Sequence, residues 1–93
     1  MEEAIEFDWD EQNKKHLKSH GVSPQEFEQV IVNDPLDLEY QVESSEERYK
    51  SLGVTDNGRV LIVVWTLREG KVRAVTAYPA SRSYAELYRE MRR

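Results

Sequence analysis

The amino-acid sequence predicts an α+β fold, an antiparallel sheet of about four to five strands with two N-terminal helices and one C-terminal helix. Three observations predict it. Two capped helical segments fill the first third of the chain, strand-like segments joined by short turns follow, and a helical stripe closes the chain. Short turns between strands produce antiparallel neighbours, which places the helices at the ends of the sequence.

The chain begins with a strand-like segment and a polar helix. Residues 5–9 alternate apolar and acidic side chains, which favours a short half-buried strand. Asp10 is a good N-cap, and Gly21 is a good C-terminal stop. A helix is therefore expected over residues 10–19.

A second helix carries a stronger start signal. Ser23 is its expected N-cap, Pro24 takes the first helical position, and Glu26 completes a capping box. Proline disfavours helix in the residue before it, so this helix should end before Pro35. Its apolar stripe consists of Phe27, Val30 and Ile31.

The middle of the chain predicts a meander of strands. The expected strands cover residues 36–40, 48–54, 59–67 and 72–78. Residues 42–47 are expected to form an acidic turn or loop. The Asp-Asn-Gly at 56–58 and the Glu-Gly at 69–70 are expected to form hairpin turns.

A third helix should follow Pro79. Ser83 and Glu86 match a capping box. Four apolar side chains then recur at helical spacing: Tyr84, Leu87, Tyr88 and Met91. We expect this stripe, with both of its tyrosines, to pack in the core instead of stacking on bases.

Length and composition predict a single domain over residues 1–93, with room for one modest core. The chain has no cysteine, which excludes disulfides and thiolate metal sites. Its longest apolar run, 60–65, is too short to cross a bilayer, and its acidic start is unlike a signal peptide. We therefore expect a cytoplasmic protein with no membrane partner.

Charge is divided unevenly along the chain. Residues 1–50 hold 14 acidic and 5 basic side chains, a net charge of −9, whereas residues 51–93 hold 4 acidic and 8 basic ones, a net charge of +4. A net-acidic protein is a poor non-specific nucleic-acid binder. The second half can still present a local basic surface, because seven of its basic residues are arginines, which bind phosphate bidentately.

The first helix lacks an ordinary apolar stripe. Asn13, His16, Leu17 and His20 share one face by helical spacing, and only Leu17 is apolar. This face is either a buried hydrogen-bonded network or the lining of a site. His16 can be a core histidine and His20 a helix cap. The pair also matches half of a zinc site, but no carboxylate completes it by spacing, so we expect no metal and no cofactor.

Short motifs follow one another along the chain in a specific order. They are Phe7-Asp8-Trp9-Asp10, Asn13, His16, His20-Gly21-Val22-Ser23, Glu47-Arg48-Tyr49, Leu52-Gly53-Val54-Thr55, Gly58-Arg59-Val60-Leu61 and Val72-Arg73-Ala74-Val75-Thr76-Ala77. Their order and spacing resemble those of the BrnT-like toxins, over about Phe7 to Tyr88.

The resemblance implies a compact RelE-like fold and a ribosome-independent ribonuclease toxin. It also implies a ribbon-helix-helix antitoxin as partner, whose complex with the toxin represses its own operon, so that DNA is met only through the antitoxin.

The chain departs from this family in two places. Many of these toxins end the last strand with Ser-Ala-Arg, whose arginine is thought to serve cleavage. Here the matching residues are Thr76-Ala77-Tyr78. Relatives also place Lys, Asn and Lys-His along the first helix, where this chain has Asn13, His16 and Ser19-His20 at slightly shorter spacing. The chain therefore resembles a divergent branch.

Metal-independent RNA cleavage needs a base, an acid and cations for the phosphorane charge. Histidines exchange protons near neutral pH, and arginines bind phosphate. The candidate catalytic residues are His20, Arg73, Tyr78 and Glu47; the candidate RNA-binding residues are His16, Arg48, Arg59 and Arg82. Strand alternation puts Arg73 and Tyr78 on opposite faces unless a bulge intervenes.

The sequence is compatible with two functions, one enzymatic and one limited to protein binding. The first is an endoribonuclease toxin held by its antitoxin. The second is a catalytically silent relative that only binds a partner, suggested by Tyr78 at the usual arginine position. In either case a basic arm of the antitoxin is expected to meet the acidic N-terminal half, through contacts that weaken with salt.

Overall fold

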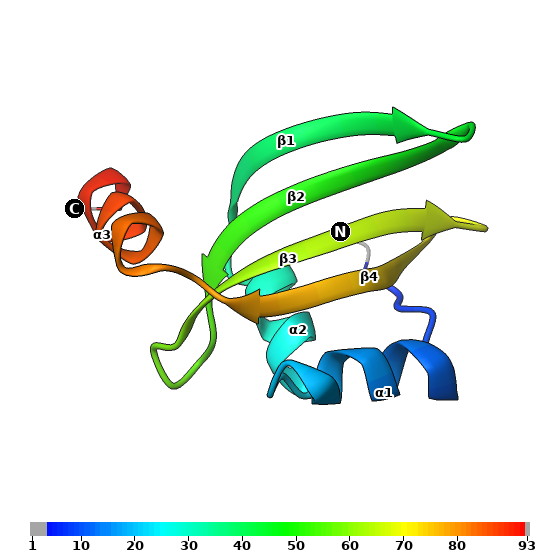
Figure 1. Ribbon diagram of the computed structural model, residues 1–93, viewed down its shortest axis with the longest axis horizontal. Helices are drawn as coiled ribbons and strands as arrows, with labels where there is room; N and C mark the ends of the chain where they lie inside the picture. Colours follow the sequence, from blue (N-terminus) through cyan, green and yellow to red (C-terminus); the bar gives the residue numbers. More distant parts are fainter. Residues whose placement is uncertain (1–3, 93) are drawn as a thin grey trace.

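The computed structural model describes residues 4–92, which form three helices and one four-stranded antiparallel sheet. The helices are α1 (Glu11–Ser19), α2 (Pro24–Val32) and α3 (Arg82–Met91), and the strands are β1 (Leu36–Glu43), β2 (Glu46–Val54), β3 (Val60–Arg68) and β4 (Lys71–Pro79). The strand order is β1-β2-β3-β4 (Figure 1). The α+β class predicted from the sequence is confirmed.

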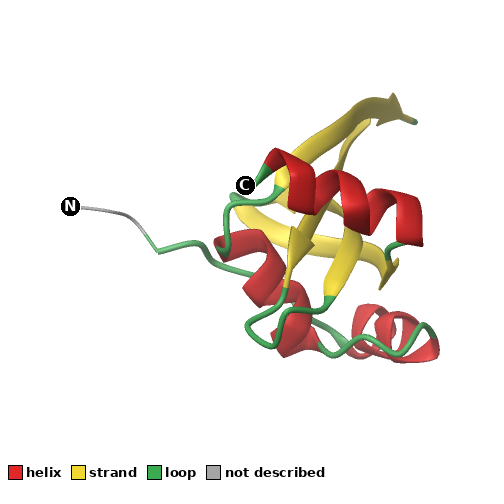
Figure 2. Ribbon diagram, turned by 90° about the vertical axis from the view of Figure 1, so that its left-hand side faces the viewer, coloured by secondary structure: helices red, strands yellow, loops and turns green. Residues whose placement is uncertain are grey.

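The two faces of the sheet are covered by different helices. One face, here called the helix face, packs on α1 and α2 around Leu17, Phe27, Val30 and Val63. The opposite face, here called the open face, is covered only at one end, where Tyr88 of α3 packs on Leu52 and Ile62. Figure 2 shows α3 crossing in front of the sheet, away from the other two helices. The rest of the open face is free of helices in the described part of the chain.

Local signals fix both N-terminal helices. Asp10 and Ser23 are the N-caps, and each forms a capping box, with Asn13 and Glu26 respectively. Gly21 follows α1 with a φ of +73°, which glycine adopts without strain. These starts and the stop agree with the sequence prediction.

Arg59 links the hairpin between β2 and β3 to the connection between α1 and α2 through hydrogen bonds. Its Nη1 donates to the carbonyl of Gly21 at 2.8 Å and to Oε2 of Glu26 at 2.9 Å. Burial raises the pKa of Glu26, but the hydrogen bond from the Ser23 amide and the pairing with Arg59 outweigh it, so the pKa lies below its ordinary value. The folded state therefore favours the ionised carboxylate.

Replacing Arg59 by alanine should lower the free energy of unfolding at pH 7 by about 1–2 kcal/mol. A carboxylate whose pKa is depressed by folding stabilises the protein above its unfolded pKa, and the effect is lost as pH falls through the folded pKa. The difference between wild type and R59A should thus be full at neutral pH and shrink below about pH 4. Urea titrations of both proteins at pH 7 and at pH 3 measure this difference in the free energy of unfolding. R89A, at an exposed arginine of α3, is the control. A gap that stays constant down to pH 3 would contradict the role of Glu26.

The N-terminal strand and the acidic loop differ from expectation. Residues 5–9 do not form a strand; they make one parallel bridge, between Phe7 and Val72. The loop expected over 42–47 shrinks to a two-residue turn at Ser44 and Ser45, because both adopt positive φ and the strands pair up to Glu43 and Glu46. The β1–β2 hairpin is therefore longer than predicted.

Gly53 lets α2 approach the sheet. A Cβ atom at this position would lie 2.9 Å from Cγ1 of Val30 and 3.1 Å from Cβ of Pro35. Any larger residue would push α2 away from β2, which accounts for glycine in the middle of this strand.

α3 differs from expectation in its start and in its packing. Its N-cap is Ser81, whose Oγ accepts from the amide of Tyr84, and the expected cap Ser83 lies inside the helix. Of the apolar stripe only Tyr88 is buried, while Tyr84, Leu87 and Met91 are exposed. The reason is position: α3 lies across one end of the sheet, so a single turn of the helix reaches the core. Within residues 4–92, every helix is too short or too polar to span a membrane.

Candidate functional site

A β-bulge decides which side chains of β4 reach the open face. Val64 pairs with Thr76 and Trp65 with Ala74, so Val75 has no partner on β3. One extra residue reverses the alternation of side chains beyond it. Arg73, Thr76 and Tyr78 therefore all lie on the open face, as their pairing with Thr66, Val64 and Ile62 shows. A regular strand would have put Arg73 and Tyr78 on opposite faces; the bulge, which the sequence analysis named as the exception, puts them on the same face.

Both histidines meet β4 beside its open face. Nε2 of His16 lies 3.1 Å from Oγ1 of Thr76, within hydrogen-bonding distance. The His16 and His20 rings pack edge to face with centroids 5.2 Å apart, and the centroid of Tyr78 lies 6.5 Å from that of His20. The two histidines are exposed. Helix α1 and strand β4 thus form a cluster of His16, His20, Thr76 and Tyr78, here called the histidine cluster.

Asn13 does not join this cluster. Its side chain is buried, accepts from the amide of Asp10 at 2.9 Å and donates to the carbonyl of Asp8 at 3.0 Å. The polar face of α1 therefore combines the two roles that the sequence allowed. Asn13 is a buried, hydrogen-bonded member of the capping box of Asp10, whereas the two histidines are exposed.

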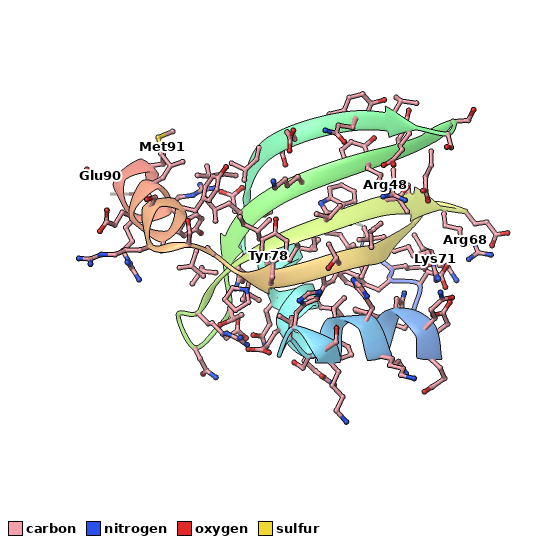
Figure 3. The ribbon with its side chains drawn as sticks, in the orientation of Figure 1. Arg48, Arg68, Lys71, Tyr78, Glu90 and Met91 are labelled. Atoms are coloured by element: carbon pink, nitrogen blue, oxygen red, sulfur yellow. The ribbon has the colours of Figure 1, made fainter. Side chains whose placement is uncertain are left out.

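Two recesses adjoin the histidine cluster, and Arg48 lines both. One, of about 330 Å³, lies between α1 and β4 and includes His16 and Arg73. The other, of about 230 Å³, lies over the sheet and includes Lys50 and Tyr78. Figure 3 shows Arg48 beside β3 and Tyr78 on β4. The contact between His16 and Thr76 joins a residue of the first recess to a residue of the second.

The cations of these recesses are partly neutralised. Arg48 pairs with Glu43 at 3.3 Å and with Glu46 at 3.2 Å. Burial lowers the pKa of Lys50, but its electrostatic interactions with Tyr78 and Glu39 outweigh this effect and raise the pKa above its ordinary value. Lys50 is therefore held in its charged form beside Tyr78.

The guanidinium group of Arg73 contacts the carboxylates of Asp10 and Asp8. Its Nη2 donates to Oδ2 of Asp10 at 2.6 Å, and its Nη1 lies 3.6 Å from Oδ2 of Asp8. The hydrogen bond from the Asn13 amide and the one from Arg73 both lower the pKa of Asp10. Because Asp10 is the N-cap of α1, Arg73 fixes the helix that carries both histidines.

Three other candidates lie away from the cluster. The carboxylate of Glu47 is on the helix face, where it accepts from the hydroxyls of Tyr40 and Tyr49. Arg59 is engaged with Gly21 and Glu26, as described above. Arg82 is on α3, where its side chain is 93% exposed and pairs with Glu86. The structure therefore brings together His16, His20, Arg48, Arg73 and Tyr78.

Thr76 and Lys50 were not among the residues singled out from the sequence. Thr76 could have been found, because it lies two positions before Tyr78 and shares its face on a regular strand. Lys50 carried no usable signal, since its neighbours in space come from β1 and β4. In residues 4–92 no three His, Asp or Glu side chains gather in a group able to hold a metal ion.

Comparison with known proteins gives a family for this chain. A family model described as ribonuclease toxin, BrnT, of type II toxin-antitoxin system matches residues 9–83. The matched segment includes both histidines and the whole sheet. None of the curated proteins that were compared matches the chain.

Proposed function

Because the chain belongs to the BrnT family of ribonuclease toxins of type II toxin-antitoxin systems, we propose that it cuts RNA at the histidine cluster without a metal ion. RNA is the substrate of this family of toxins, and an antitoxin is the partner. The observation that carries the proposal is the packing of the His20 ring against His16 and Tyr78, which line two neighbouring recesses that share Arg48.

The proposed reaction is an internal phosphoryl transfer. The ribose 2′-oxygen attacks the adjacent phosphorus, the bond from phosphorus to the 5′-oxygen breaks, and a 2′,3′-cyclic phosphate and a 5′-hydroxyl result. One histidine takes the proton of the 2′-hydroxyl, and the other gives a proton to the leaving 5′-oxygen. No water, metal or further reactant enters this balance.

The remaining residues position the two histidines and stabilise the charge of the phosphorane. Thr76 holds the His16 ring through its hydroxyl, and Arg73 holds the start of α1 through Asp10. Arg48 and Lys50 supply positive charge beside the cluster for the phosphorane oxygens. In this scheme Tyr78 supports the His20 ring, while Glu47, Arg59 and Arg82 have no contact with RNA at the scissile phosphate.

The partner in this proposal is a ribbon-helix-helix antitoxin. Such a protein binds operator DNA, so the chain would meet DNA only through the complex. The net charge of −5 makes the chain a poor non-specific DNA binder, which supports this indirect contact.

The test is cleavage by purified chain, freed of antitoxin, of a mixed RNA in the presence of EDTA. We expect products with 2′,3′-cyclic phosphate ends, and no cleavage of the same RNA carrying 2′-O-methyl groups. Cleavage that requires added divalent cation would overturn the metal-independent scheme.

No cleavage under any condition would favour the second function, a silent protein that only binds its antitoxin. Tyr78 in place of the family's usual arginine is the observation behind that alternative. A Tyr78→Arg variant that gains cleavage would then support it.

A further inference from the structure

The helix face carries an apolar groove that none of the described helices covers. The groove, of about 560 Å³, runs between the N-terminal segment, α2 and the β3–β4 hairpin. Its large apolar lining residues are Ile5, Ile31, Pro35, Trp65, Leu67 and Val72. Ile5 is 48% exposed and Leu67 is 49% exposed. Large apolar side chains left open together on a small protein mark an interaction surface.

An aromatic ladder extends this groove along the long β1–β2 hairpin. Trp65 stacks on Tyr49 with centroids 4.4 Å apart, and Tyr49 packs on Tyr40 at 5.2 Å. Tyr40 is 54% exposed, and Val42 beside it is also exposed. The groove and the ladder together form one continuous surface on the helix face, here called the aromatic groove.

The rim of the aromatic groove is acidic. Glu6 lines it directly, and Glu47 accepts from both tyrosines of the ladder. Asp37 accepts from the hydroxyl of Ser51, which in turn accepts from the indole of Trp65. Basic side chains of the sheet lie elsewhere: Arg48, Lys50 and Arg73 are on the open face, and Figure 3 shows Arg68 and Lys71 at the β3–β4 turn. The described rim of the aromatic groove is therefore acidic, whereas on the open face the carboxylates of Glu39, Glu43 and Glu46 are paired with Lys50 and Arg48.

We propose that the aromatic groove is the docking surface for a segment of the antitoxin that carries apolar anchors flanked by lysines or arginines. The proposal rests on the family's toxin-antitoxin pairing. Basic flanks complement Glu6, Asp37 and Glu47, and apolar anchors fill the groove beside Trp65. A second copy of this chain fits poorly, because a two-fold contact would bring two acidic rims together.

This placement separates docking from inhibition. The aromatic groove is on the helix face, and the histidine cluster is beside the open face, so the docked segment leaves the cluster free. The antitoxin needs another part to block RNA, and a groove variant should lose affinity while it keeps its own RNA cleavage.

The test compares two exposed leucines, Leu67 in the groove and Leu87 on α3. We expect L67E to raise the Kd for the purified antitoxin, the product of the adjacent reading frame, by about tenfold or more, and L87E to change it by less than about twofold. Calorimetric titration measures both, and circular dichroism melting checks that each variant folds. For wild type the Kd should also rise from low to high salt.

Other results of the comparison between L67E and L87E would contradict the proposal. Wild-type affinity in L67E, equal losses in both variants, or no binding of the antitoxin by wild type would overturn the proposal. A wild-type dimer that L67E converts to a monomer, seen by light scattering without antitoxin, would overturn it in favour of a self-contact. Cleavage of RNA is scored separately, so a wild type that binds through Leu67 but never cuts RNA contradicts the proposed function alone.

Discussion

Replacing His16 or His20 by alanine should lower the rate of RNA cleavage by a factor of about 10²–10⁴. Each histidine is proposed to move one proton of the reaction, and loss of either leaves that proton without a carrier. Both rings are exposed beside β4, so their removal opens no cavity and the fold should hold. Single-turnover cleavage of a labelled RNA measures the rate, and thermal melting measures the fold.

Lys15 provides the matched control, because it is an exposed basic residue of the same helix. K15A should cleave within about twofold of wild type, as a surface substitution outside the site. Each histidine variant should also lose one limb of the pH–rate profile, which a merely structural role would not do. Histidine variants that cleave as fast as K15A would remove the cluster from the mechanism.

Replacing Phe27 by alanine should lower the free energy of unfolding by about 3–5 kcal/mol. Phe27 is fully buried in α2, and its ring meets Phe7 edge to face at 6.3 Å and Trp9 at 5.5 Å. The cavity would open where α2, the N-terminal segment and the sheet meet. A loss of this size is a large share of the stability of a small domain.

Urea unfolding followed by circular dichroism measures this loss, and L87A is the control on α3, where the leucine is exposed. L87A should change the free energy of unfolding by less than about 0.5 kcal/mol. A loss below 1 kcal/mol in F27A would contradict this expectation and would mean that Trp9 and Phe7 close over the cavity.

Sequence reasoning was most successful where the signal lies within a few residues. The N-cap at Asp10, the capping box at Ser23, the stop at Gly21 and the Glu69-Gly70 turn were all predicted, and all are present. It was less successful for α3, where helical spacing correctly predicted a helix but not which residues it would bury. Burial of Tyr88 with exposure of Leu87 depends on where the helix crosses the sheet.

The sequence by itself determined the α+β class, the family resemblance, the helix caps and the unusual polar face of α1, because each rests on residue types at short spacing. Only the tertiary structure decided which residues of that face are buried and which lie beside β4. The bulge at Val75 placed Arg73 on the same face as Tyr78, and the alternation of side chains along β2 placed Glu47 on the opposite face. Register between strands is set by pairing of residues far apart in the chain, and a one-residue shift moves a side chain to the other face.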